Sequence, residues 1–125
     1  MLVAGCLDDL PAMQQALAML PDGAYGQVFV ETETPDDSVE LAAPVRMTVT
    51  RLPRSTSRGE ALGAAIAGWV AEWMPETRDD DEAATAWIGE IASAGLPNLS
   101  ELRYRIARLH VLQEMPRLEA GTARS

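Results

Sequence analysis

Apolar positions along this chain follow two different spacings. Runs of consecutive or alternating apolar residues are typical of strands, and apolar residues that recur every three or four positions are typical of helices. The first pattern predicts strands at residues 1–4, 27–31, 45–50 and 84–89, with a short edge piece at 39–41. The second pattern predicts helices at about residues 10–20, 59–74 and 99–113. The predicted order is therefore strand, helix, two strands, helix, strand, helix.

Polar residues and prolines mark where two of these helices begin and end. Asp8 is the expected N-cap of the first helix, Pro11 is tolerated in its first turn, and the turn at 21–23 ends it. Asn98, with Glu101 three residues later, predicts a capping box at the start of the last helix. These signals place a helix N-terminus directly after the first strand.

The alternation of strands and helices predicts an α/β fold, because parallel strands need crossover connections that are usually helical. We expect three layers: a mostly parallel sheet of about four to five strands, with helices on both faces. At 125 residues, the chain has the length of one ordinary domain. We place that domain at residues 1–118 and a flexible tail at 119–125.

The chain is strongly acidic, with 19 aspartates and glutamates against ten basic residues and a net charge of −9. Residues 1–45 contain no basic residue. An acidic surface repels nucleic acid and anionic lipid, so we expect neither as a partner. The longest apolar run is far shorter than the roughly 18–20 residues that span a bilayer, so we also expect no membrane insertion.

All ten basic residues are arginines, and seven of them fall into two groups. The first group is Arg46, Arg51, Arg54 and Arg58, and the second is Arg103, Arg105 and Arg108. A guanidinium matches two phosphate oxygens with two hydrogen bonds. If the protein binds a phosphate, these arginines are therefore the natural candidates.

The chain has one cysteine, Cys6, and one histidine, His110. An internal disulfide and a metal site built from several cysteines or histidines are therefore excluded, which fits a cytoplasmic protein. Cys6 lies at the expected start of a helix, where the pKa of a thiol can fall. We favour a small packed residue over a reactive thiol, because a catalytic cysteine needs a base nearby and the sequence shows none. His110 is expected on the last helix.

The turn after the first strand, from Gly5 to Leu10, is the candidate binding site. Ligands of open parallel sheets bind beyond the carboxyl ends of the strands, where the strand order reverses. Gly5 would let a ligand approach closely, and the following helix offers free N–H groups to an anion. The segment has this single glycine rather than G-x-G-x-x-G. The alternative is that Gly5 only makes a tight turn.

Three charged residues later in the chain are further candidates. Arg51 and Arg54 can clamp the phosphates of an adenosine nucleotide. Their alternative role is surface pairing with acids, namely Glu31, Glu33 or Glu60. Glu31 ends the second predicted strand, where an acid in a dinucleotide fold can hydrogen-bond a ribose. Its alternative is a solvated strand end.

Four partial motifs follow one another along residues 1–109. They are Leu2-Val3-Ala4-Gly5 with Leu10-Pro11-Ala12-Met13, then Val28-Phe29-Val30-Glu31, then Val49-Thr50-Arg51-Leu52, and finally Trp87-Ile88-Gly89-Glu90 before the second arginine group. In the order and spacing of these motifs, the sequence resembles the carboxyl-terminal domain of the siderophore-interacting proteins. These are ferric-siderophore reductases related to the ferredoxin–NADP reductases. The resemblance implies a ferredoxin reductase-like module that binds NADPH or NADH.

In that family, an amino-terminal barrel binds FAD, and the carboxyl-terminal domain presents the nicotinamide to the flavin. The reduced flavin then passes electrons to a ferric siderophore. The resemblance implies that this chain is the NAD(P)H-binding half, and that a separate flavin-binding domain or partner chain supplies the FAD. Its cofactor-binding residues would be Gly5, Asp8, Asp9, Leu10, Glu31, Arg51, Arg54 and Glu90, with no catalytic side chain. By the same resemblance, Glu90 would approach the nicotinamide, while its alternative is an acid at a helix N-terminus.

The sequence also departs from the family pattern. The family has D-E-T-A where this chain has Cys6-Leu7-Asp8-Asp9, and its closing G-Y-W-R is absent. Two carboxylates beside a pyrophosphate repel it by on the order of 1–4 kcal/mol each. The alternative function is therefore an α/β domain that has lost the cofactor and acts as an interaction module, such as a homodimer.

Overall fold

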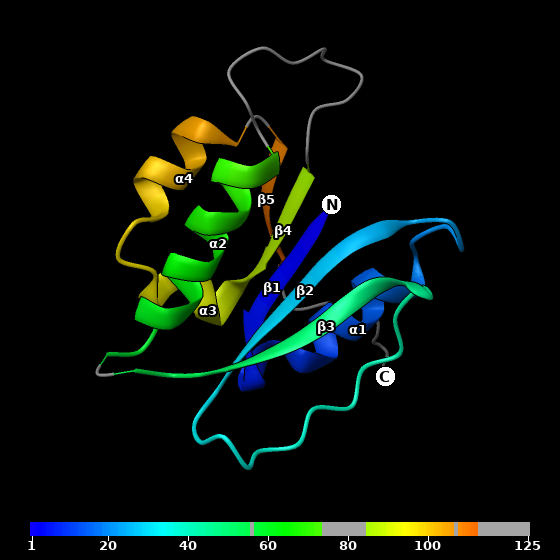
Figure 1. Cartoon of the computed structure of the whole chain (residues 1–125), viewed down its shortest axis with the longest axis horizontal. Helices are drawn as coiled ribbons and strands as arrows, with labels where there is room; N and C mark the ends of the chain where they lie inside the picture. Colours follow the sequence, from blue (N-terminus) through cyan, green and yellow to red (C-terminus); the bar gives the residue numbers. More distant parts are fainter. Residues whose placement is uncertain (56, 74–84, 107, 113–125) are drawn as a thin grey trace, which may run out of the picture.

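The computed structural model describes residues 1–55, 57–73, 85–106 and 108–112, and within them the chain forms one five-stranded sheet (Figure 1). The strands are β1 (Leu2–Cys6), β2 (Tyr25–Thr32), β3 (Arg46–Pro53), β4 (Thr85–Gly89) and β5 (Arg108–Leu112). They lie in the order β3-β2-β1-β4-β5, and every neighbouring pair is parallel. The expected α/β fold with a parallel sheet is confirmed.

Helices cover both faces of the sheet, which confirms the three expected layers (Figure 1). The helices are α1 (Leu10–Ala18), α2 (Glu60–Trp73), α3 (Glu90–Gly95) and α4 (Leu99–Arg105), and a 3-10 turn, η1 (Leu7–Asp9), joins β1 to α1. One core lies between α1 and the sheet, and the other lies between the sheet and α2 to α4. The apolar residues at helical spacing in this segment predict its buried stripe, and four of them, Leu62, Ile66, Trp69 and Val70, are buried in the second core. The side chain of the fifth, Trp73, lies outside the described residues.

β1 is the central strand, and all five of its residues are buried. Its side chains alternate between the two cores: Leu2 packs with the α2 side and Val3 with the α1 side. Continuous burial on both faces explains why its sequence is an apolar run rather than an alternating one.

The connection from β2 to β3 is an irregular segment on the α1 side of the sheet. The Gln14 side chain on α1 holds it, because its Nε2 donates to the Ala42 carbonyl (2.9 Å) and its Oε1 accepts from the Ala42 N–H (2.8 Å). The strand predicted at 39–41 is wrong, since no strand forms there. Val39 and Leu41 instead fill the α1 core from this irregular segment, so their apolar character reflects packing rather than strand pairing.

The last predicted helix is correct only in its first half. α4 ends at Arg105, and the chain then continues as β5. β5 pairs with the outer edge of β4 over five residues, so backbone hydrogen bonds to β4 replace those of a longer helix. His110 therefore lies on a strand rather than a helix, and its ring stacks on Trp87 with centroids 4.4 Å apart.

Two predicted helix caps also take other roles. Asn98 does precede α4, but its side chain makes no cap hydrogen bond, and its Nδ2 instead donates to the Gly63 carbonyl on α2 (3.2 Å). Asp9 rather than Asp8 is the residue that precedes α1, and its carboxylate does not cap that helix either. Both side chains bind a neighbouring element instead of their own helix.

The flexible tail expected at 119–125 lies outside the described residues. Among the residues that the structure does describe, no helix is long and apolar enough to cross a bilayer.

Candidate functional site

A cleft opens where the strand order of the sheet reverses. The chain runs outward from β1 through β2 to β3, and β4 then lies on the other side of β1. Beyond the carboxyl ends of β1 and β4 lies a cleft of about 600 Å³. Its lining includes apolar side chains of α1 and α3, with charged residues beside them: Asp8, Asp9, Pro11, Ala12, Arg58, Glu90, Ile91 and Ala94, together with Gly95. Such a switch point is where open α/β sheets bind ligands.

A smaller hollow of about 140 Å³ lies beside this cleft, beyond the ends of β1 and β2. It is lined by Cys6, Leu7, Asp8, Glu31, Thr32, Glu33, Arg54 and Arg58. Asp8 and Arg58 line both spaces, so the two adjoin. Together they follow the carboxyl edge of the three strands β2, β1 and β4.

Asp9 is a buried carboxylate, 4% exposed, that holds the start of α3. Its Oδ1 accepts the N–H of Ile91 (2.9 Å), and its Oδ2 accepts the N–H groups of Ala92 (2.9 Å) and Cys6 (3.2 Å). The negative carboxylate also opposes the positive end of the α3 dipole. Asp9 therefore joins the end of β1 to the first turn of α3, across 82 residues of sequence.

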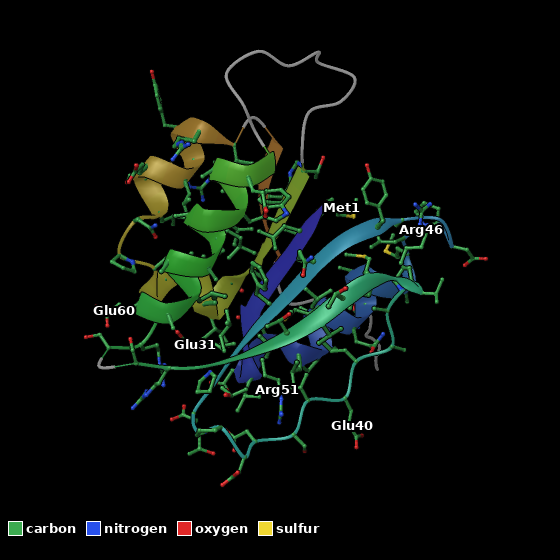
Figure 2. The ribbon with its side chains drawn as sticks, in the orientation of Figure 1. Met1, Glu31, Glu40, Arg46, Arg51 and Glu60 are labelled. Carbon is green, nitrogen blue, oxygen red and sulfur yellow. The ribbon has the colours of Figure 1, made fainter. Side chains whose placement is uncertain are left out.

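Glu31 is the corresponding carboxylate on β2, and it is also 4% exposed. Its two oxygens accept the Gly59 N–H (2.9 and 3.1 Å), and Oε2 also accepts the Leu62 N–H (3.4 Å). Figure 2 shows Glu31 between the end of β2 and the start of α2. The alternative of a solvated strand end is wrong, because the carboxylate is buried and accepts the N–H groups at the start of α2.

These two carboxylates change which groups are free to bind an anion. The first N–H groups of α2 and α3 already donate to carboxylates of this chain. A phosphate therefore cannot use these two helix starts without displacing a buried acid. The positively charged groups that line the cleft and the hollow are Arg54 and Arg58.

Arg54 and Arg58 both face the carboxylate of Glu33. Arg54 Nη1 lies 3.7 Å from Oε1, and Arg58 Nη2 lies 3.9 Å from Oε2. The expected alternative of surface pairing is therefore found for Arg54. Both distances exceed those of hydrogen bonds, so the pairs are weak and solvent-exposed.

Arg51 lies away from both spaces. Its Nη1 donates to the Asp37 carbonyl (2.7 Å), which ties β3 to the segment after β2. In Figure 2 its side chain points toward that segment. Glu60, one of the acids expected as a surface partner for Arg51, instead accepts a hydrogen bond from Ser55 Oγ (2.6 Å).

The structure gathers five of the eight predicted cofactor-binding residues at this edge: Asp8, Asp9 and Glu90 line the cleft, and Asp8, Glu31 and Arg54 line the hollow. Gly5, Leu10 and Arg51 line neither of these two spaces. A Cβ at Gly5 would lie 2.6 Å from Met13 Sδ, so the space beside this glycine is filled by the protein itself.

Arg58 is the residue that the predicted set lacked. The sequence pointed to Arg58 only as a member of the first arginine group. The fold shows that it is the one arginine of that group that lines both the cleft and the hollow. Within the described residues, no group of three or more histidine, cysteine, aspartate or glutamate side chains could hold a metal ion.

Cys6 is buried at the end of β1, and its thiol donates to Asp9 Oδ2 (3.4 Å). Burial first and the neighbouring Asp9 carboxylate second raise the pKa of this thiol to about 11, against two weaker opposing backbone hydrogen bonds. A thiolate is disfavoured here, so the idea of an activated cysteine at a helix start is wrong, and the packed residue is confirmed.

We expect the Cys6 thiol to react slowly with a disulfide reagent at pH 8 in the folded protein and rapidly in urea. Because its folded pKa lies above the unfolded value of about 8.5, folding favours the neutral thiol. This contribution to stability is intact below pH 8 and is lost as the pH rises from about 8.5 to about 11. Urea unfolding at pH 7.5, 9 and 10 measures this loss of stability. The part of the pH dependence that the Cys6 thiol causes should be absent in Cys6→Ala. Fast labelling of the folded protein at pH 8 would contradict this account.

Comparison with known proteins agrees with the resemblance in sequence. Residues 1–95 match the siderophore-interacting protein family. The chain belongs to this family. Proteins of Mycobacterium bovis and Mycobacterium tuberculosis whose function is not described share 33% identity with it over 94 residues, which cover 70% of this chain.

Solved structures of siderophore-interacting proteins share the fold. SipS from Aeromonas hydrophila superposes with a TM-score of 0.58 at 16% identity over 86% of this chain, and the protein from Acinetobacter baumannii with 0.54 at 14% over 88%. This chain spans 29% of the length of the mycobacterial relatives, and 46% and 44% of the two solved chains. The matched region is therefore one part of the length of these relatives.

Proposed function

We propose that this chain is the nicotinamide-nucleotide-binding half of a flavin-dependent ferric-siderophore reductase. The observation that carries the proposal is the cleft beyond β1 and β4, at the reversal of strand order, in a member of the siderophore-interacting protein family. Its volume of about 600 Å³ lies within the range of small-molecule sites. A cleft of this volume can hold the nicotinamide mononucleotide half of the dinucleotide, and the smaller hollow beside it can hold part of the adenosine half.

The lining suits a flat ring with a polar edge. Ile91 is 39% exposed although it is large and apolar, and with Pro11, Ala12 and Ala94 it offers an apolar surface for a ring. Glu90 and Asp8 beside this surface can accept hydrogen bonds from a carboxamide or from ribose hydroxyls. The bound nicotinamide would supply the hydride, while the residues of this chain orient the ring and keep water from its apolar face.

The complete reaction needs a flavin, which the proposal assigns to another part of a longer protein or to a partner chain. The fraction of its relatives that this chain spans supports such a division. Electrons would pass from the nicotinamide to the flavin and from the flavin to a ferric siderophore. This chain would hold the electron donor only.

Titration calorimetry with NADPH and NADH at low salt tests the proposal. We expect binding in the micromolar to low-millimolar range and none for FAD. Ala94→Trp fills the cleft from the exposed side of α3 and should weaken binding by about tenfold or more. Ala64→Trp is the matched control, since Ala64 is equally exposed but lies on α2 outside the cleft lining. Equal effects of the two variants would contradict this location of the site.

A second function has one specific observation in its favour. The starts of α2 and α3, which could have bound phosphate, are occupied by the carboxylates of Glu31 and Asp9. A domain that has lost its nucleotide and serves as an interaction module would need no free helix starts. In the same experiment, this function predicts no heat with either nucleotide and elution as a dimer from a size-exclusion column.

A further inference from the structure

We propose that the outer edge of β3 pairs with the same edge of a second copy of this chain, so that two five-stranded sheets join across a two-fold axis. The pairing is antiparallel, with Val49 facing the second copy's Val49, and it forms an isologous dimer. No residue of β3 lines the cleft or the hollow. The inference therefore goes beyond the proposed function and does not depend on it.

The outer side of β3 carries free backbone groups. β3 ends the sheet next to β2, and no strand in the described part of the chain pairs with its other side (Figure 1). The Arg54 N–H, directly after β3, donates to the Thr32 carbonyl at the end of β2 (2.8 Å). Successive residues of a strand in a parallel ladder direct their backbone groups to opposite sides, so every second residue back from Arg54 also faces β2. The backbone groups of Met47, Val49 and Arg51 therefore face outward.

This edge lacks most of the features that keep exposed strands from pairing. Edge strands are usually short or bulged, or they carry lysine or proline. β3 is eight residues long, pairs with β2 in continuous register and has its only proline, Pro53, at its end. The chain contains no lysine. The Met47 N–H already donates to the Pro44 carbonyl (2.9 Å), so Val49 and Arg51 supply the outward donors.

The sequence of β3 is symmetric about Val49, and this symmetry selects a second copy as the partner. Thr48 and Thr50 flank Val49, whose β-branched side chain is 36% exposed. In an antiparallel pairing centred on Val49, each Thr48 lies opposite a Thr50, and such cross-strand threonine pairs are favourable. The two outward-facing Val49 residues then exchange both of their backbone hydrogen bonds.

The charges of β3 fit the same register. Arg51 lies opposite Met47 of the second copy, and Arg46 lies opposite Leu52, so no like charges are directly opposite each other. A register in which Arg46 faced Arg51 would place like charges together and would set outward-facing residues against inward-facing ones. β3 also carries two arginines and no acid in a chain of net charge −9. The positive edge of each copy therefore meets the negative field of the other.

Sedimentation equilibrium of the full chain, from micromolar to near-millimolar concentration, tests the inference. We expect a reversible equilibrium between the 13.5 kDa monomer and a species of twice that mass. Val49→Lys and Val49→Glu each put two like charges opposite each other at the axis, so each alone should weaken the dimer by about tenfold or more. An equimolar mixture of the two variants should restore association, because unlike charges then face each other.

Ala64→Lys and Ala64→Glu are the matched controls, because Ala64 is exposed on α2, away from β3. Both should associate as the unaltered chain does. Far-ultraviolet circular dichroism of every variant checks that the fold is kept.

Val49→Cys tests the register directly. The Cα atoms of a hydrogen-bonded antiparallel pair lie about 5.5 Å apart, within the range that a disulfide can bridge. The natural cysteine, Cys6, is buried, so the introduced thiol is the accessible one. Oxidised glutathione should therefore link two copies of Val49→Cys and should not link Ala64→Cys.

Three results would overturn the inference. They are an unaltered chain that stays monomeric throughout this concentration range, a dimer that persists in Val49→Lys and Val49→Glu, and a mixture of these two variants that associates no better than either alone. Nucleotide binding is measured in a separate titration, so each of these results leaves the proposed function standing.

Discussion

Replacement of Asp9 by alanine is expected to lower the free energy of unfolding by about 3–5 kcal/mol. The buried carboxylate accepts the N–H groups of Cys6, Ile91 and Ala92. Alanine would leave these donors without a partner, and the start of α3 would lose the negative charge that opposes its dipole. Because α3 forms one wall of the cleft, we also expect the variant to lose nucleotide binding.

Urea unfolding followed by far-ultraviolet circular dichroism measures this loss. Asp8→Ala is the control, since Asp8 is adjacent in sequence but exposed, and its loss should change stability by less than about 0.5 kcal/mol. Asp9→Asn keeps the shape but has one accepting oxygen, so it should lie between the unaltered chain and Asp9→Ala. A loss below about 1 kcal/mol for Asp9→Ala would show that the carboxylate does not hold α3.

Replacement of Gly59 by alanine is expected to lower the free energy of unfolding by about 2–4 kcal/mol. Gly59 has a φ of +87°, a left-handed conformation that side chains disfavour. A Cβ at this position would also overlap the Gly95 carbonyl at the end of α3. Relief of that overlap would pull the Gly59 N–H away from Glu31 and so weaken the start of α2.

Gly68→Ala is the matched control for this prediction. Gly68 lies on the exposed side of α2, and a Cβ there meets nothing within 4 Å. Alanine in an exposed helix interior should raise stability by about 0.5–1 kcal/mol. Thermal unfolding of both variants tests whether Gly59→Ala lowers the stability and Gly68→Ala raises it. A Gly59→Ala variant as stable as the unaltered chain would contradict the role assigned to this glycine.

Both predictions concern the same structural principle. The carboxyl end of each of two adjacent strands supplies a carboxylate to a helix that begins far away in sequence: Asp9 after β1 holds α3, and Glu31 in β2 holds α2. The acids that looked unfavourable for a nucleotide site are thus part of its framework. The negative charge that remains for a ligand to meet is that of Asp8, Glu33 and Glu90, beside the positive charge of Arg54 and Arg58.

Periodic apolar patterns were sufficient for the central part of the fold. The buried run at 2–4 and the apolar stripe of Leu62, Ile66 and Trp69 predicted the central strand and α2 correctly, since burial on one or both faces is written into the spacing of apolar residues. The same reasoning failed at Arg108–Leu112, where a helix was predicted and pairing with β4 decided the outcome. It also failed at Val39 and Leu41, which are apolar because α1 and the sheet cover them.

The sequence by itself determined an α/β domain with a parallel sheet, its family, and the strand ends at which a ligand site would lie. Only the tertiary structure decided which charged residues are free there. Glu31 and Asp9 accept hydrogen bonds from N–H groups 28 and 82 residues away. Arg51 donates to the Asp37 carbonyl, whereas Arg54 and Arg58 both line the hollow. The physical reason is that a charged side chain takes the partner that the packed strands and helices bring within hydrogen-bond distance, and local sequence spacing does not encode that partner.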